Sequence, residues 1–197
     1  MARCKPLIGG PYRAGGATAP VSARCEVGHT SRMAGDDTDH AFSQLTQELD
    51  TPMFIATASA GGERSGCLVG FASQVSIHPA RFLVCISVKN HTHRVAANAE
   101  TIGVHIVPAE AGDLAELFGG RTGDEIDKFE RAAWHPAPDG TPLLDDCPDR
   151  FVGRVTSTLD LGDHTGFVLE PVHAEYTGVR RQLSMQRAMA IDPGHAP

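Results

Sequence analysis

Residues 65–79 read SGCLVGFASQVSIHP, and this stretch combines two kinds of residue. The run CLVGFA is apolar and predicts a buried strand. Ser73, Gln74 and Ser76 follow it among apolar neighbours, and Pro79 then ends the run. Hydrogen-bonding groups at the far end of a core strand either satisfy the backbone locally or face a polar ligand. The rest of the sequence has to distinguish these two alternatives.

The composition indicates a single domain with a sizeable core. The chain has 197 residues, of which 41% are hydrophobic. Its formal net charge is −7, and no cluster of Lys and Arg dominates one segment. Nucleic-acid binding is therefore not expected, because neutralising phosphates requires a basic patch. No apolar stretch approaches the ~18 residues that span a bilayer, so membrane insertion is not expected either.

The cysteines favour a reducing compartment. The chain has five, an odd number with scattered spacing and no CxxC pair. This pattern is typical of a cytoplasmic protein without a disulfide framework or a structural zinc site. Cys67 and Cys85 lie in apolar runs and are expected to be inert core residues. The N-terminal stretch MARCKPLIGG lacks the apolar core of a signal peptide, which also favours the cytoplasm.

The chain divides into three predicted parts. Residues 1–35 are rich in Gly, Ala, Pro and Arg without periodicity, and we expect them to be disordered. Residues 36–178 form the expected ordered domain, and residues 179–197 form a tail that begins as a short helix. Met33 stands just before the ordered part and offers an alternative translation start, which N-terminal sequencing of the native protein would test.

The ordered part predicts six or seven strands and few helices. The expected strands are 53–59, 65–76, 81–88, 101–108, 151–161 and 166–176. The expected helices are 41–49, 94–99 and 111–120, with a short one near 127–132 inside an otherwise irregular connection, 121–149. Most links between strands are short, which favours antiparallel neighbours. The pattern predicts a mainly β fold with peripheral helices, arranged as a small closed or partly closed β-barrel.

Two strands carry further information on burial. Residues 81–88, RFLVCISV, are apolar on both faces and are expected to be buried on both. Residues 151–161 alternate in polarity, which predicts a half-buried antiparallel strand. The apolar positions on its expected buried face are Phe151, Val155, Leu159 and Leu161.

The segment KNHTHR, residues 89–94, combines positive charge with the predicted start of a helix. Lys89, Arg94 and the Thr92 hydroxyl suit a phosphate group there. The alternative is that Thr92 only caps its own helix and the basic residues are solvated, and the local sequence favours this alternative. A phosphate site shared with the polar end of the neighbouring strand becomes competitive when both segments are considered together.

Histidines mark two further candidate positions. His164 lies in GDHTGF, residues 162–167, between two good strands, where ordinary turn chemistry competes with a role over a cofactor. The pair His91-x-His93 is weak evidence for a metal site without a third ligand, so a surface loop is expected and no metal. The sequence contains no GxSxG, P-loop or GxGxxG motif for hydrolase, NTPase or Rossmann chemistry.

A series of sequence blocks resembles the flavin reductase-like family in order and spacing. In chain order, the blocks are TAS before a turn, SGCLVGFASQVSIHPARFLVCIS, KNHTHRVAANAETIGVHIV, LAELF, GTPLLDD and GDHTGFVLEPV. They cover most of residues 50–177. The resemblance implies an FMN-binding split β-barrel, usually a homodimer. It also implies an NAD(P)H:flavin oxidoreductase that binds FMN or FAD, takes hydride from NADH or NADPH, and supplies reduced flavin to a monooxygenase.

The resemblance also implies roles for individual residues. The segment 68–76 would lie along the flavin, with Val69, Gly70 and Phe71 by the isoalloxazine ring and Gln74, Val75 and Ser76 by the ribityl chain and phosphate. Lys89, Asn90 and Thr92 would complete the phosphate site. His164 would lie near the ring, where nicotinamide stacks, as the catalytic residue. The polar end of the opening stretch is then where the barrel meets the polar tail of the flavin.

The sequence departs from the family pattern at four places in this region, one of which is FASQ, residues 71–74, in place of a Ser-rich stretch. Leu68 and Gly70 stand where the family often has polar residues, and His78-Pro79-Ala80 replaces its usual Asp-Pro-Pro. These departures leave an alternative open, in which the protein is a split barrel that binds flavin, a deazaflavin or haem without reducing free flavin.

Overall fold

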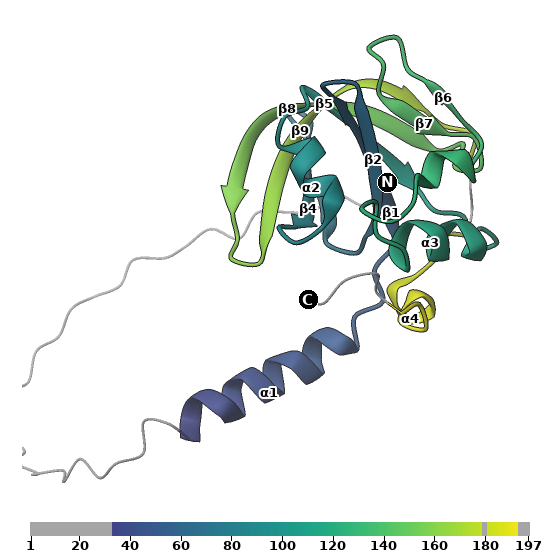
Figure 1. Cartoon of the computed structure of the whole chain (residues 1–197). Helices are drawn as coiled ribbons and strands as arrows, with labels where there is room; N and C mark the ends of the chain where they lie inside the picture. The colour runs from purple at the N-terminus through teal and green to yellow at the C-terminus, as the bar shows by residue number, and fades with distance from the viewer. Residues whose placement is uncertain (1–32, 179–180, 193–197) are drawn as a thin grey trace, which may run out of the picture. The chain divides into compact units, whose positions relative to one another are not determined.

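The computed structural model describes residues 33–178 and 181–192 (Figure 1). The predicted disorder of residues 1–32, and residues 179–180 and 193–197 of the predicted tail, lie outside the described residues. The chain divides into two compact units between Phe42 and Ser43, and the β-strands belong to the second unit. Helix α1 spans Met33–Gln47, so residues 33–35, expected to be disordered, are helical. Acidic residues in its first turns favour the start of a helix.

Seven antiparallel strands form the main sheet, in the order β2-β1-β5-β8-β9-β4-β3. Their bounds are β1 Phe54–Ala60, β2 Glu63–Val69, β3 Ala72–Ser76, β4 Arg81–Ser87, β5 Thr101–Ile106, β8 Arg150–Asp160 and β9 His164–Glu175. The predicted mainly β fold is confirmed. Among the helices of the described part of the chain, none is long and apolar enough to cross a membrane.

The sheet curls so that its two edges meet. The edge strands β2 and β3 are consecutive in the chain and are joined by only Gly70 and Phe71. Phe54 of β1 and Phe82 of β4 lie near opposite edges in the strand order, yet their ring centroids are 5.6 Å apart. Because no strand pairing joins β2 to β3 across the described sheet, the barrel is split at this point.

The expectation of one strand over residues 65–76 was therefore wrong. β2 pairs with β1, whereas β3 pairs with β4, and the chain changes from one edge of the sheet to the other at residues 70–71. The Phe71 carbonyl accepts a hydrogen bond from the Cys85 N–H at 2.9 Å, so Phe71 is already paired on the β4 side. A continuous apolar run gives no signal of this change, because it does not say which neighbouring strand each half pairs with.

Short helices surround the barrel: α2 (His91–Ala96), α3 (Gly112–Gly119), the 3₁₀ helix η1 (Lys128–Glu130) and α4 (Met185–Ala188). Each lies near a predicted position. The predicted cap was wrong by two residues, because Asn90 and not Thr92 is the N-cap of α2. The Asn90 side chain accepts a hydrogen bond from the Thr92 N–H at 2.9 Å.

The connection 121–149 contains a hairpin that the sequence did not predict. β6 (Trp134–Pro136) pairs with β7 (Pro142–Leu144) in a separate two-stranded sheet. Pro136 and Pro142, which face each other next to the hairpin loop, had argued for an irregular segment. A two-stranded ribbon tolerates them because each strand has an unpaired edge.

The core consists of two main clusters on either side of β1. Phe54, Ala56 and Ala58 of β1 face the barrel interior, where Val84 and Phe167 also lie. On its other face, Ile55 packs in the cluster formed by the helices and β7, whose largest buried members are Phe118, Phe129 and Leu144. β1 is therefore buried on both faces and anchors the edge strand β2.

Two burial expectations were wrong in part. In β4, Val84 and Ile86 are buried, but the other residues are only half-buried. In the β8–β9 hairpin, Leu159 and Leu161 are 45% and 49% exposed, because the hairpin tip extends beyond the barrel. The alternating pattern predicts which residues share a face, but not where the covering elements end.

Candidate functional site

A cleft of about 210 Å³ lies at the split between β2 and β3. We call it the junction cleft. It is lined by residues from β2, β4, β9 and α4 and from the segments beside them. These are Met53, Cys67, Leu68, Val69, Gly70, Phe71, Cys85, Ile86, Ser87, Asn90, His164 and Met185. Its walls are mostly apolar, with Ser87, Asn90 and His164 as polar groups.

Half of the predicted site residues come together in this cleft. They are Val69, Gly70, Phe71, Asn90 and His164. The fold explains the convergence, because the end of β2 and the end of β4 meet at the split, and His164 pairs with Ser87 across β9 and β4. The Phe71 and His164 rings contact each other edge to face, with centroids 5.3 Å apart.

His164 is oriented by its neighbour in the chain. Its Nδ1 lies 2.8 Å from a carboxylate oxygen of Asp163. This hydrogen bond, together with the charge interaction, lowers the pKa of Asp163. Because an ionised carboxylate only accepts, Nδ1 is the donor and Nε2 is left to interact with other groups. Gly162, two residues earlier, has φ of 92°, a backbone conformation that glycine adopts readily at such a turn.

The structure places Lys89 and Thr92 outside the lining of the junction cleft. Lys89 is exposed in the turn after β4, and its charge contributes to lowering the pKa of Asp163. The Thr92 side chain is buried, and its hydroxyl lies 2.9 Å from the Ser65 hydroxyl. Thr92 therefore ties α2 to β2, whereas Lys89 stands close to the turn that carries His164.

Gln74, Val75 and Ser76 lie on the edge strand β3 and do not line the cleft. The Gln74 side-chain amide donates to the Ser76 carbonyl at 3.1 Å, and the Ser73 hydroxyl donates to the Gln74 carbonyl at 3.2 Å. These polar groups satisfy the local backbone, which is one of the two alternatives for the opening stretch. They are also solvent-accessible beside the split, so the other alternative stays a prediction.

Comparison with known proteins identifies the family. The model described as "Flavin reductase like domain" matches residues 46–188, which is most of the chain. The chain belongs to the flavin reductase-like domain family.

Individual relatives of this flavin reductase-like protein agree with the family match. A ferric-chelate reductase (NAD(P)H) from Archaeoglobus fulgidus is 27% identical over 62% of this chain and 74% of its own length. An FMN reductase (NADH) RutF from Ancylobacter novellus is 28% identical over 93% of this chain and 91% of its own. The chain spans 64% of the length of another RutF, from Bradyrhizobium diazoefficiens.

Solved structures support the fold. An NADH:FAD oxidoreductase from Streptomyces globisporus superposes with a TM-score of 0.69 at 20% identity, covering 82% of this chain and 95% of that one. The chain spans 49% of a longer putative oxidoreductase from Sinorhizobium meliloti, with a TM-score of 0.66 at 21% identity. At these identities, the likeness establishes that the flavin reductase-like chain has the split-barrel fold.

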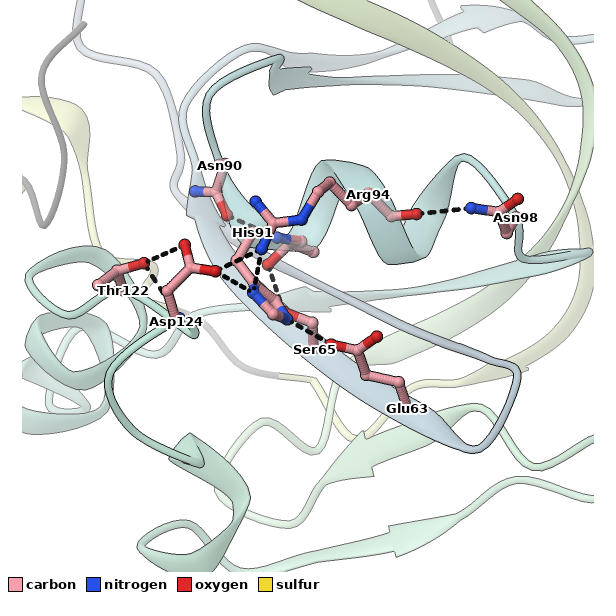
Figure 2. Close-up of polar contacts among 9 residues, drawn as sticks. Glu63, Ser65, Asn90, His91, Arg94, Asn98, Thr122 and Asp124 are labelled. Atoms are coloured by element: carbon pink, nitrogen blue, oxygen red, sulfur yellow. Dashed lines mark hydrogen bonds and ion pairs between the residues drawn. The ribbon is translucent and has the colours of Figure 1, made fainter.

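A second cavity of the flavin reductase-like domain, about 300 Å³, lies between β2 and residues 123–129. Figure 2 shows the ion-pair cluster beside it. The His91 ring lies between Glu63 and Asp124, with Nε2 2.8 Å from Glu63 and Nδ1 2.9 Å from Asp124. Arg94 also pairs with Asp124, and the hydrogen bonds from His91 and Arg94 lower the pKa of Asp124 to about 2.

This cluster changes the interpretation of the KNHTHR segment. Arg94 binds Asp124, so its charge is already paired and serves to fix residues 122–124 against α2. His91 and His93 have different partners, since His93 Nε2 lies 2.8 Å from the Thr165 hydroxyl. Across residues 33–178 and 181–192, no group of three or more His, Cys, Asp and Glu side chains could hold a metal ion. The pairing of Glu63 with His91 joins distant segments and has no local sequence signal.

Lys128 is a buried residue that the sequence did not single out. Its side chain is 4% exposed, and Nζ donates to the Gly66 carbonyl at 3.0 Å and to the Phe118 carbonyl at 2.9 Å. Burial lowers the pKa of Lys128 to about 8. The lysine joins the end of α3 to the outer edge of β2.

Two thiols line the junction cleft. Burial raises the pKa of Cys67 to about 11, and it also raises the pKa of Cys85. Both cysteines are free and remain protonated near neutral pH. Cys67 is buried, as expected of an inert core residue, whereas Cys85 is only half-buried, so the expectation of a core position was wrong for Cys85.

Proposed function

We propose that this protein is an NAD(P)H-dependent flavin reductase that binds FMN or FAD in the junction cleft. The observation that carries the proposal is the convergence of Val69, Gly70, Phe71, Asn90 and His164 at the split of a flavin reductase-like barrel. Apolar walls with polar groups at one side suit a planar ring whose one edge carries hydrogen-bonding atoms. The bound flavin would supply the hydride-accepting chemistry.

The protein's own residues would bind and orient the reactants. Backbone N–H groups of residues 69–71 are candidates to stabilise negative charge on the reduced ring. His164, oriented by Asp163, would position the nicotinamide of NADH or NADPH or donate a proton through Nε2. Asn90 would contact the ligand from the start of α2.

The polar tail of the flavin would lie towards β3. Gln74 and Ser76 would meet the ribityl chain and phosphate, with Val75 between them, and Lys89 would supply positive charge. The Thr92 hydroxyl, paired with Ser65, would act indirectly by holding α2 in place.

The first test is an absorbance spectrum of the purified protein, followed by NADH or NADPH with free FMN under air. Oxidised-flavin bands and rapid consumption of the pyridine nucleotide support the reductase. Flavin bands without consumption overturn it in favour of a binding protein. A haem or deazaflavin spectrum overturns the cofactor assignment while keeping the fold.

We further propose that the protein acts as a homodimer and passes reduced flavin to a monooxygenase. The edge strand β3 and its neighbours expose large apolar side chains: Phe71, Val75 and Ile77 are 60%, 52% and 71% exposed. An exposed apolar edge strand is a site for pairing with another chain, and a second copy would cover it.

The three free cysteines of the described residues support a cytoplasmic location.

A further inference from the structure

The C-terminal segment 181–185 is fixed against two other segments of the domain. The Leu183 N–H donates to the Val107 carbonyl and the Met53 N–H donates to the Leu183 carbonyl, both at 2.8 Å. The Met185 N–H donates to the Thr51 carbonyl at 2.8 Å. Leu183 itself is buried in the core. The backbone at Met185 is therefore held in place at the start of α4.

The Met185 side chain occupies the space that Gly70 leaves open. A Cβ atom at position 70 would overlap Met185 Cε, and it would lie 3.3 Å from Met185 Sδ and 3.6 Å from Met53 Sδ. Two thioethers thus lie against the backbone at the split between β2 and β3. A side chain at residue 70 would require the end of the Met185 side chain to move, so the departure from the family pattern at Gly70 fits the present position of the methionine.

Met185 also stands between two cavities. The junction cleft measures about 210 Å³, and a neighbouring cavity under α4 measures about 330 Å³. Both are lined by Met53, Leu68, Asn90 and Met185. Cavities that bind small molecules usually measure about 300–1,000 Å³, so the junction cleft alone is small for a flavin. A methionine side chain is unbranched and changes rotamer readily, so it can widen the cleft by moving aside.

We propose that Met185 is a wall of the flavin site that positions the isoalloxazine ring. Its thioether contacts the ring, separates it from the α4 cavity, and adjusts the width of the cleft to the ring. The inference rests on the proposed function, because it assumes that flavin occupies the junction cleft. Thioether–aromatic contacts provide the affinity, and the fixed backbone of segment 181–185 provides the position.

The test is equilibrium binding of FMN, and of lumiflavin, which has the ring without the ribityl phosphate, to the full chain without NADH. Met185→Ala should weaken the binding of both by about 2- to 10-fold, because the lost contact is with the ring. Met185→Leu should restore most of the affinity, since its side chain has a similar volume. The bound flavin's absorbance bands should shift in the Ala variant and return in the Leu variant.

Met189→Ala is the matched control. Met189 is a methionine at the end of the same short helix, it is 58% exposed, and it lines the α4 cavity but not the junction cleft. The control should bind both flavins as the unchanged protein does. Thermal unfolding of all variants separates a loss of folding from a loss of contact.

If Met185→Ala and Met189→Ala are both folded and bind the flavins with equal affinity, the inference is overturned. It is also overturned if Met185→Ala loses affinity for FMN but not for lumiflavin. Failure of the unchanged protein to bind FMN would overturn it too. If the unchanged protein binds FMN but does not oxidise NADH, the proposed function fails, while the binding comparison still decides the role of Met185.

Discussion

At the scale of the residue, His164 is the side chain on which turnover should depend most. Its Nδ1 is held by Asp163, and its ring contacts Phe71 in the lining of the junction cleft. His164→Ala should lower kcat by about 100-fold if the ring transfers a proton, with a much smaller effect on flavin affinity. Steady-state NADH oxidation and FMN binding measure the two effects. Unchanged turnover would remove His164 from the mechanism.

Lys128 predicts a specific dependence of stability on pH. Its pKa is about 8 in the folded protein, against a usual value of 10.5. Between these values the unfolded chain binds more protons than the folded one, so stability rises with pH over this window. The neutral amine keeps two N–H donors for the Gly66 and Phe118 carbonyls, so its hydrogen bonds survive deprotonation.

Urea unfolding at pH 8 and pH 10.5 measures this effect. Over this range, the free energy of unfolding of the unchanged protein should rise by about 3 kcal/mol relative to that of Lys128→Met. The methionine variant serves as the reference because it lacks the titrating group but keeps the apolar chain. If the free energy of unfolding changed equally with pH in the two proteins, the prediction would be contradicted.

At the scale of the element, His105 links strand β5 to its neighbours. The buried ring accepts a hydrogen bond from the Leu144 N–H at Nε2, 3.1 Å away, and Nδ1 lies 3.0 Å from the Ile55 carbonyl. Nδ1 is therefore the protonated nitrogen of a neutral imidazole. A second proton, on Nε2, would face the Leu144 donor. Burial lowers the pKa of His105 from 6.5 to about 4.

Acid should therefore weaken the packing of β1, β5 and β7. Between pH 6.5 and 4 the unfolded histidine is protonated and the folded one is not, so stability is lost as pH falls through this window. Protonation of His105 should lower the free energy of unfolding by about 3 kcal/mol over this window. Unfolding experiments on His105→Gln, which carries no titrating group, should show a shallower decline. An equal decline would assign the acid sensitivity to other groups.

The elements show what the sequence could and could not predict. Most helix and strand positions followed from local patterns, whereas the resemblance to the flavin reductase-like family implied Val69, Gly70, Phe71, Asn90 and His164, which the fold brings together. The change of edge at residues 70–71 was missed because an apolar run does not say which neighbour each half pairs with. Met53, Met185 and the Glu63–His91–Asp124 cluster were missed because they depend on contacts between distant segments.

At the scale of the whole molecule, the exposed apolar edge should determine the oligomeric state. Ile77→Asp places a charge at a position that is 71% exposed and that a second copy would bury. We expect this variant to be monomeric at concentrations where the unchanged protein is dimeric, as measured by light scattering during size-exclusion chromatography. Val172→Asp, at an exposed apolar position on β9, is the control and should stay dimeric. A monomeric unchanged protein would contradict the proposed homodimer.

The two-residue link between β2 and β3 has a consequence for the movement of ligands. Val69 and Ala72 are separated by three peptide units, so their Cα atoms can never be more than about 11 Å apart. The covalent chain thus limits how far the barrel wall can part at this end, whatever occupies it. The routes left to a molecule as long as a flavin pass beside the link, past His164, which contacts Phe71, or past Met185 of the C-terminal segment, which contacts Gly70. Substitutions there should change rates of exchange, whereas an inserted residue between Gly70 and Phe71 should open a second route.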